Sequence, residues 1–167
     1  MDTMSASTQF HALTVARVDA EAGGAIAVSF VVPPNLREVF AFTPGQFLTL
    51  RATIDGQDVR RSYSICSSLH QWRTEGIVQV GIRPVEGGVF SNWAVQHLHA
   101  GDSLQVMPPQ GRFCVQRTRA LHRVGFAAGS GITPILSIMA STLQDQPESK
   151  FTLVYGCLLY TSDAADD

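Results

Sequence analysis

The segment RRSYSICSS, residues 60–68, combines guanidinium groups, an aromatic ring and hydroxyls on what its alternation of polar and apolar residues predicts to be a strand. In an extended strand, Arg61 and Tyr63 point to one face and Ser62 and Ser64 to the other. An arginine can bind a phosphate through two hydrogen bonds, and a tyrosine ring can stack on a planar heterocycle. The pattern suits a nucleotide-like ligand, and a surface strand with a stacked Arg-Tyr pair would show the same pattern.

Two adjacent glycines precede a predicted helix in the segment EGGVFSNW, residues 86–93. The backbone N–H groups of Gly88, Val89 and Phe90, with the hydroxyl of Ser91, would form an anion site at the start of that helix. The commoner role of such a serine is to cap the helix. Both roles can hold together.

A third glycine-rich segment, AAGSGITP, residues 127–134, lies between a predicted strand and a predicted helix. Gly129 and Gly131 leave room for backbone N–H groups and the positive helix end to approach a diphosphate. Pro134 suits the first turn of a helix, where its missing N–H costs nothing. A glycine turn that only lets strand and helix pack would have the same sequence, so this motif alone leaves both readings open.

Metal binding and acid–base catalysis find little support in the sequence. His97 and His99 lie two residues apart, whereas two helical ligands on one face need a spacing of four. The cysteines at 66, 114 and 157 are far apart, which indicates neither a disulfide framework, a zinc site nor a plant-type iron–sulfur cluster. We therefore assign no metal ligand and no catalytic side chain.

The elements that must position these segments fall into two groups. Residues 10–116 contain short apolar segments separated by turns, including a strong hairpin signal at Asp55-Gly56. This pattern predicts an antiparallel β-barrel with Greek-key topology, interrupted by one helix at 90–101 that stops at Gly101. The expected strands are 10–18, 25–32, 46–54, 57–66, 76–85, 103–108 and 112–115.

From residue 117 to residue 156 the pattern changes to strand, glycine turn, helix and strand, the first βαβ part of an α/β nucleotide-binding domain. The expected apolar face of the helix consists of Ile132, Ile135, Leu136, Ile138 and Met139. We expect residues 1–9 to be a flexible N-terminus. Residues 157–167, CLLYTSDAADD, resemble a translated sequencing adapter, and we expect a non-native or disordered tail there.

Composition excludes several classes of partner. The chain has 167 residues, 45% of them apolar, and a formal net charge of -2, so it lacks the basic field that nucleic acid or an anionic membrane would attract. No apolar run approaches the roughly 20 residues that span a bilayer, and the first ten residues lack the pattern of a signal peptide. We expect a cytoplasmic protein without nucleic-acid or membrane partners.

The order R-x-Y-S-x-x-S, G-G-x-x-S, P-x-G-x-F and G-S-G-I-T-P resembles the ferredoxin-NADP reductase family over nearly all of residues 8–156. The resemblance implies bound FAD, with Arg61 on the pyrophosphate, Tyr63 packed on the isoalloxazine and Ser64 near its reactive N5 edge. It implies that Thr133 lies beside the flavin where the nicotinamide of NAD(P)H arrives. The full set of cofactor residues so implied is Arg61, Ser62, Tyr63, Ser64, Gly81, Ile82, Arg83, Gly87, Gly88, Val89, Phe90, Ser91, Gly129, Ser130, Gly131 and Thr133.

Within this family, residues 87–113 and the segment FTLVYG look most like reductase components of ring-1,2-phenylacetyl-CoA epoxidases. The resemblance implies a flavin-dependent NAD(P)H oxidoreductase that passes electrons through FAD to an iron–sulfur domain or ferredoxin and then to an oxygenase in phenylacetate catabolism. We expect the [2Fe–2S] domain of such proteins to be missing here. Because the nucleotide-binding domain is only half built, we expect this chain to turn over NAD(P)H poorly by itself.

Three alternatives stay open: the reductase of another multicomponent oxygenase, a flavohaemoglobin-type reductase, and a non-catalytic FAD-binding regulator. The family pattern after FTLVYG is not matched either, so the sequence leaves the choice between NADH and NADPH open.

Overall fold

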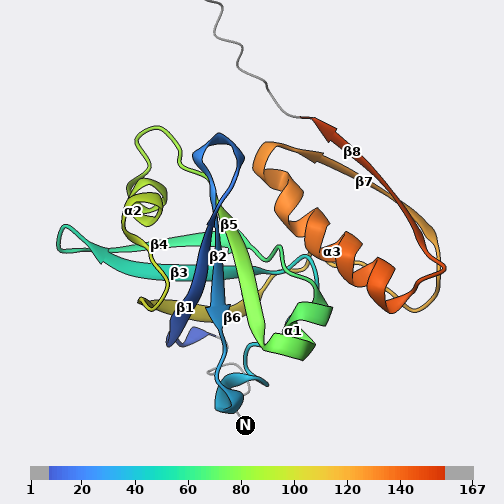
Figure 1. The fold of residues 1–167 in the computed structure, drawn as a ribbon, viewed down its shortest axis with the longest axis horizontal. Helices are drawn as coiled ribbons and strands as arrows, with labels where there is room; N and C mark the ends of the chain where they lie inside the picture. Colours follow the sequence, from blue (N-terminus) through green and yellow to red (C-terminus); the bar gives the residue numbers. More distant parts are fainter. Residues whose placement is uncertain (1–7, 157–167) are drawn as a thin grey trace, which may run out of the picture.

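A computed structural model describes residues 8–156 and divides them into a barrel and a smaller strand–helix–strand unit (Figure 1). Our expectations for residues 1–7 and 157–167 lie outside the described residues. The barrel strands are β1 (His11–Ala20), β2 (Ile26–Val31), β3 (Phe47–Ile54), β4 (Gln57–Ser64), β5 (Ile77–Ile82) and β6 (Ser103–Gln110). Short 3₁₀ turns at Ala22–Gly24 and Pro34–Leu36 join neighbouring segments.

The six barrel strands form one antiparallel sheet in the order β4-β3-β6-β1-β2-β5. Strand β6 lies between β1 and β3, as expected when the last strand of a Greek key returns across the barrel. An antiparallel bridge between Ile65 and Val80 joins the end of β4 to β5, so the sheet closes on itself. The interior is apolar, with Phe30, Leu48 and Val80 fully buried. The predicted antiparallel barrel is confirmed.

The hairpin predicted at Asp55-Gly56 joins β3 and β4. Both turn residues have positive φ, 50° at Asp55 and 76° at Gly56, the conformation that a two-residue type I′ turn requires. This turn fixes the register that pairs Leu48 with Tyr63 and Leu50 with Arg61.

The prediction of one helix in the barrel was wrong, because the structure has two. Helix α1 (Leu69–Glu75) begins where the Ser68 hydroxyl accepts a hydrogen bond from the N–H of Gln71, at 3.2 Å, and ends at Gly76 in the left-handed conformation. Helix α2 (Val89–His97) ends four residues before Gly101, so the predicted stop was also misplaced. Gly101 instead donates its N–H to the carbonyl of Val15 in β1.

The strand expected at 103–108 is β6, which is longer than predicted and runs through the two prolines as far as Gln110. Prolines are tolerated there because the pairing of β6 with β3 is irregular between Phe47 and Thr49, and the pairing with β1 stops at Val106. Residues 112–115 are not a strand.

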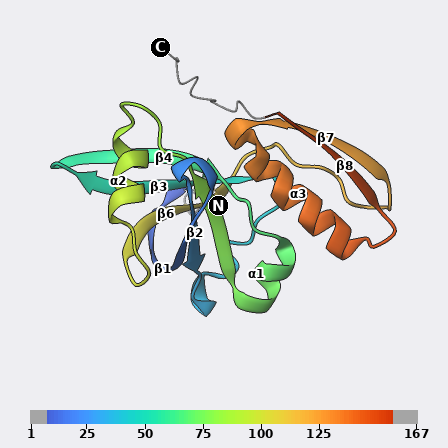
Figure 2. The same ribbon diagram turned by 45° about the horizontal axis from the view of Figure 1, so that its top comes forward.

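The βαβ unit contains β7 (His122–Ala128), a 3₁₀ turn at Gly129–Gly131, α3 (Ile132–Asp145) and β8 (Lys150–Gly156). The strands pair in parallel, which confirms the predicted start of a nucleotide-binding domain. In both views α3 lies between this two-stranded sheet and the barrel (Figures 1 and 2). Ile135 and Ile138 are buried as expected of the apolar face.

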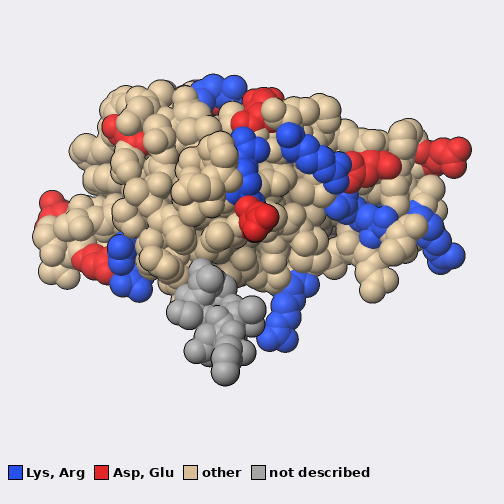
Figure 3. All heavy atoms as spheres, turned by 90° about the horizontal axis from the view of Figure 1, so that it is seen from below, with Lys and Arg blue, Asp and Glu red and all other residues tan. Residues whose placement is uncertain are grey.

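The face of the β7–β8 sheet that turns away from α3 is exposed. Phe126 is 74% exposed, and its neighbours Val124 and Val154 are 54% and 48% exposed. Parallel sheets are normally covered on both faces, so this face is unusually apolar for a surface. On the side of the molecule seen in Figure 3, by contrast, basic and acidic side chains are interspersed.

None of the described helices is long and apolar enough to cross a membrane. Within residues 8–156 there is also no group of three or more His, Cys, Asp or Glu side chains that could hold a metal ion.

Candidate flavin and nucleotide site

A cleft of about 550 Å³ lies where β4, β5, the loop after β5, the start of α2 and the turn before α3 meet. Most of the predicted cofactor residues line it: Arg61, Ser62, Tyr63, Gly81, Arg83, Gly88, Val89, Phe90, Ser91 and Ser130. They come from the barrel and from the βαβ unit. The cleft therefore joins the two parts of the chain.

Strand β4 presents Arg61 and Tyr63 on one face, as the alternation predicts, because they pair with the inward-facing Leu50 and Leu48 of β3. The Tyr63 ring is half-buried and packs on the ring of Phe90 in α2, with centroids 5.9 Å apart. Burial raises the pKa of Tyr63, while the nearby Arg61 cation opposes that rise, so the phenol is neutral at physiological pH.

On the opposite face of β4, the hydroxyl of Ser62 lies 2.9 Å from that of Thr49 on β3, a cross-strand hydrogen bond. Ser64 is partly buried at the end of β4 and does not line the cleft.

The loop from Arg83 to Gly88 is pinned to the first turn of α2. Asn92 donates its amide N–H groups to the carbonyls of Val85 (2.8 Å) and Gly88 (2.6 Å). The buried hydroxyl of Ser91 accepts a hydrogen bond from the N–H of Val85, at 3.3 Å. Ser91 is thus not the cap of α2, and its hydroxyl hydrogen remains available to donate to an anion in the cleft that it lines.

Gly88 is the residue at which α2 begins, and no described side chain caps this helix. The first N–H groups of α2 are therefore available to a ligand. A β-carbon on Gly88 would lie 2.5 Å from Cγ2 of Val85 and 2.6 Å from Oγ of Ser91. The close turn requires glycine for this steric reason.

Of the predicted residues at the turn before α3 and in its first turn, only Ser130 lines the cleft. Gly129, Gly131 and Thr133 are its neighbours in the chain and do not line the cleft. A β-carbon on Gly129 would come within 3.7 Å of Nη1 of Arg83, so the glycine turn sits beside this arginine. No described side chain caps the start of α3.

Thr133 packs against strand β5. A β-carbon on Gly81 would lie only 2.9 Å from Cγ2 of Thr133, and the Thr133 hydroxyl donates to the carbonyl of Ser130, at 3.0 Å. Gly81 therefore admits the start of α3 to the barrel surface.

Two further predicted residues cannot contribute side chains to the cleft. Ile82 is fully buried in the barrel interior, and Gly87 forms an exposed turn with φ of 72°. Three residues of the cleft were missed: Pro84, Val85 and Glu86. Their place in the chain could have predicted them, because residues 84–86 connect two predicted segments of the site, 81–83 and 87–91.

This arrangement fits a dinucleotide with a planar ring system. Arg61 and Arg83 place positive charge at the cleft, and Tyr63 offers a half-buried aromatic surface. The uncapped start of α2 lines the cleft, and Ser130 of the turn before the uncapped helix α3 lines it as well. Guanidinium groups and helix starts bind diphosphates, and aromatic rings stack on heterocycles. Glu86 is the acidic residue on the cleft wall.

Cys66, just after β4, should be chemically inert. Burial raises the pKa of its thiol to about 12, so almost none of it is thiolate at pH 8. Cys114 is exposed. We expect iodoacetamide at pH 8 to label Cys114 in the folded protein and Cys66 only after denaturation, as read by peptide mass spectrometry. Equal labelling of both in the folded state would contradict this assignment.

Comparison with known proteins agrees with this geometry. Residues 22–115 match the family described as "Oxidoreductase FAD-binding domain", and residues 126–163 match "Oxidoreductase NAD-binding domain". The chain is 48% identical to a component of the 1,2-phenylacetyl-CoA epoxidase of Escherichia coli (strain K12), over 89% of the chain and 41% of that protein. It is 40% identical to the ferredoxin reductase component of 3-ketosteroid-9-alpha-monooxygenase of Rhodococcus rhodochrous, over 86% of the chain and 40% of that protein.

Among solved structures, the Flavohem-like FAD/NAD binding domain of nitric oxide dioxygenase from Vibrio cholerae O1 biovar El Tor superposes with a TM-score of 0.74. The match has 23% sequence identity and covers 93% of this chain and 65% of that one, so it supports the fold. The chain spans about two fifths of the length of the curated relatives it matches. It belongs to the ferredoxin-NADP reductase family, with a FAD-binding domain followed by residues of an NAD-binding domain.

Proposed function

We propose that this chain is the flavin- and nucleotide-binding part of an NAD(P)H-dependent reductase that passes electrons to an iron–sulfur centre and then to an oxygenase. The observation that carries the proposal is that Arg61 and Tyr63 of the barrel and Ser130 of the βαβ unit line the same cleft. An enzyme of this kind needs its flavin and its nicotinamide donor to meet at such a junction. We place it in the cytoplasm, where NAD(P)H is abundant.

The role proposed for each residue is the one that the family resemblance implies, and the chemistry of its side chain supports it. Arg61 binds the pyrophosphate of FAD with the help of the uncapped start of α2, and Tyr63 packs on the flavin ring. The family resemblance implies that Ser64, which does not line the cleft, lies near the reactive N5 edge of the flavin, and Thr133 holds the start of α3 against β5. Bound FAD supplies the ability to accept a hydride and to release electrons singly. The chain's residues bind and orient, and none is required as an acid or base.

The substrate of the oxygenase is proposed to be phenylacetyl-CoA, because the 48% identity to a phenylacetyl-CoA epoxidase component exceeds the 40% identity to a ketosteroid monooxygenase component. The partner of the reductase would then be the oxygenase component of an epoxidase. A complementation assay tests this choice: the complete reductase should restore epoxidation of phenylacetyl-CoA by the other components. Restoration of ketosteroid hydroxylation alone would favour the second relative.

A visible spectrum tests the central proposal. The purified chain, reconstituted with FAD and freed of excess, should be yellow with a flavin absorbance band, and NADH or NADPH should bleach it under anaerobic conditions more slowly than dithionite does. Bleaching by dithionite alone, in a polypeptide with the whole nucleotide-binding domain, would favour a non-catalytic FAD-binding regulator. A colourless protein after reconstitution would refute flavin binding.

A further inference from the structure

Helix α3 carries polar residues at a spacing of four along the side that faces the barrel: Thr133, Ser137, Ser141 and Asp145. A spacing of four places side chains one above another on one helix face. Serine is a poorer helix former than alanine, and a buried hydroxyl costs free energy unless it is hydrogen-bonded. Ser137 and Ser141, the two buried members of this row, therefore need a reason beyond helix formation. We call these four residues the α3 polar row.

The two serines of the row bond to one short segment of the barrel, at 2.7 and 3.0 Å. The hydroxyl of Ser137 donates to the carbonyl of Ser67, and the hydroxyl of Ser141 accepts from the N–H of Leu69. Both serines are fully buried. Ser137 therefore satisfies a backbone carbonyl of the barrel, and Ser141, one helical turn later, satisfies a backbone N–H.

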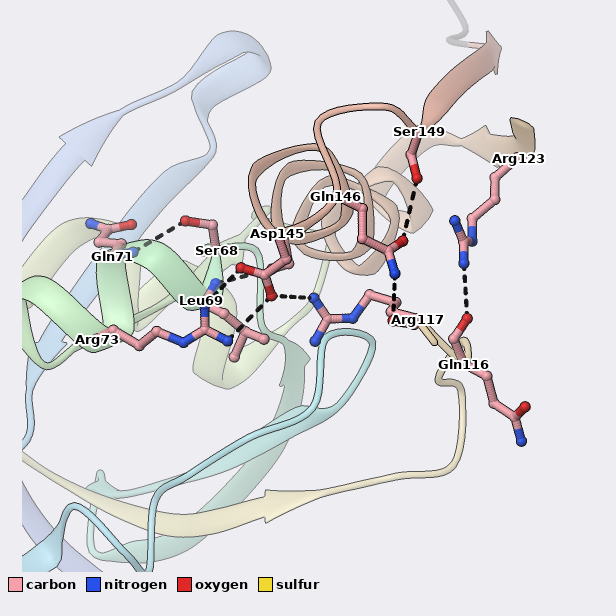
Figure 4. A network of polar contacts seen from close by, with 11 residues as sticks. Ser68, Leu69, Gln71, Arg73, Gln116, Arg117, Arg123, Asp145, Gln146 and Ser149 are labelled. Carbon is pink, nitrogen blue, oxygen red and sulfur yellow. Dashed lines mark hydrogen bonds and ion pairs between the residues drawn. The ribbon is translucent and has the colours of Figure 1, made fainter. Parts of the chain in front are cut away.

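The end of the row is held by charge. The carboxylate of Asp145 bonds to Arg73 of α1 at 2.7 Å and to Arg117, between β6 and β7, at 2.9 Å (Figure 4). The hydrogen bond from Arg73, and then that from Arg117, lower the pKa of Asp145, so the carboxylate is ionised at neutral pH. Figure 4 shows both guanidinium groups converging on Asp145 from separate segments.

The barrel segment that bonds to Ser137 and Ser141 directly follows β4, the strand that carries Arg61 and Tyr63. Ser67 lies three residues after Ser64, and its own hydroxyl accepts from the N–H of Gln79 in β5, at 3.0 Å. Two residues further along β5 is Gly81, the contact of Thr133. The end of β4, strand β5 and α3 thus form a closed ring of contacts around one edge of the cleft.

We propose that the α3 polar row is a positioning device that fixes the nicotinamide side of the cleft relative to the flavin strand. The inference rests on the proposed function, and it adds Ser137, Ser141 and Asp145, which do not line the cleft. Hydrogen bonds serve this purpose better than apolar packing because they are directional and hold α3 in one register, whereas an apolar face can slide.

The test compares the FAD-loaded protein with the double variant Ser137→Ala/Ser141→Ala and with Asp145→Asn. Two net hydrogen bonds correspond to roughly a tenfold to hundredfold change in an equilibrium. We expect amide hydrogen exchange in residues 129–141 to quicken by about that factor in the double variant, with exchange in β2 unchanged. FAD affinity should stay within about twofold of wild type, while the visible circular dichroism of the flavin changes.

Single-turnover reduction by excess NADH adds a kinetic readout. We expect the rate at saturation to fall about tenfold in the double variant, with no rise in the NADH concentration that gives half the maximal rate. Asp145→Glu, which keeps the carboxylate, should restore wild-type exchange and rate where Asp145→Asn does not.

Thr142→Val is the matched control. Thr142 is buried beside Ser141, and its hydroxyl has no hydrogen-bond partner among the described residues. This variant should leave exchange, dichroism and rate unchanged. Unchanged exchange in the double variant, or a tenfold rise in exchange without any change in flavin dichroism or rate, would overturn the positioning role. Failure of wild type to bind FAD would refute the proposed function instead, and the exchange result would still decide whether the row holds α3.

Discussion

Alanine at position 61 is expected to weaken FAD binding by roughly tenfold to a hundredfold. Arg61 is exposed at the cleft, and its side chain is free of ion pairs to any described carboxylate. A hydrogen bond to a charged group contributes about 1.5–3 kcal/mol, and each 1.4 kcal/mol changes affinity about tenfold. Titration of the apoprotein with FAD, followed by quenching of flavin fluorescence, measures the change.

The double variant Arg61→Ala/Tyr63→Ala should lose FAD on gel filtration. Tyr63 adds an aromatic surface already ordered against Phe90, so its removal costs stacking and leaves that core ring uncovered. Tyr63→Phe keeps the ring and should bind FAD within a few-fold of wild type.

Arg60→Ala is the control for the loss of a cation from β4. Arg60 is paired with Asp58 at 2.8 Å, contacts the Phe10 ring and does not line the cleft. FAD affinity should be unchanged in this variant. A folded Arg61→Ala/Tyr63→Ala protein that retained FAD like wild type would remove the basis for the flavin assignment.

Local patterns predicted most of the barrel because each depends on neighbouring residues. The alternation in β4 and the Asp55-Gly56 turn are determined by residues adjacent in the sequence. The parallel pairing of β7 with β8 follows from a strand–helix–strand order. Helix α1 was missed because seven residues carry almost no periodic signal. Its boundaries were nonetheless marked by Ser68 before it and Gly76 after it, the usual cap residues.

The candidate site was predicted unevenly for the same reason. Arg61 and Tyr63 share a strand, so their common face was readable from spacing. The bonds from Ser137 to Ser67 and from Leu69 to Ser141 join residues 70 and 72 positions apart, and only the packing of α3 on the barrel creates them. The hydrogen bond from the N–H of Val85 to Ser91 was not predicted, because it is set by a loop whose path has no local sequence signature.

Gly81→Ala is expected to lower the free energy of unfolding by about 1–3 kcal/mol, the usual cost of overpacking a tight contact. The new β-carbon would lie 2.9 Å from Cγ2 of Thr133. Thr133 cannot easily turn away, since its side chain is β-branched and its hydroxyl is bonded to the carbonyl of Ser130. Helix α3 must therefore shift, and urea unfolding would measure the cost.

The second-site variant Thr133→Ser makes this prediction specific, because it removes Cγ2 and keeps the hydroxyl. In the background of Gly81→Ala it should restore most of the lost stability, so the two changes would be non-additive by about 1 kcal/mol or more in a double-mutant cycle. Gly131→Ala is the control, since a β-carbon there meets nothing within 4 Å, and it should leave stability unchanged or raise it. Additive effects of Gly81→Ala and Thr133→Ser would mean that the start of α3 does not rest on β5. The contact between Thr133 and β5 would then not be what holds the βαβ unit against the barrel beside the cleft.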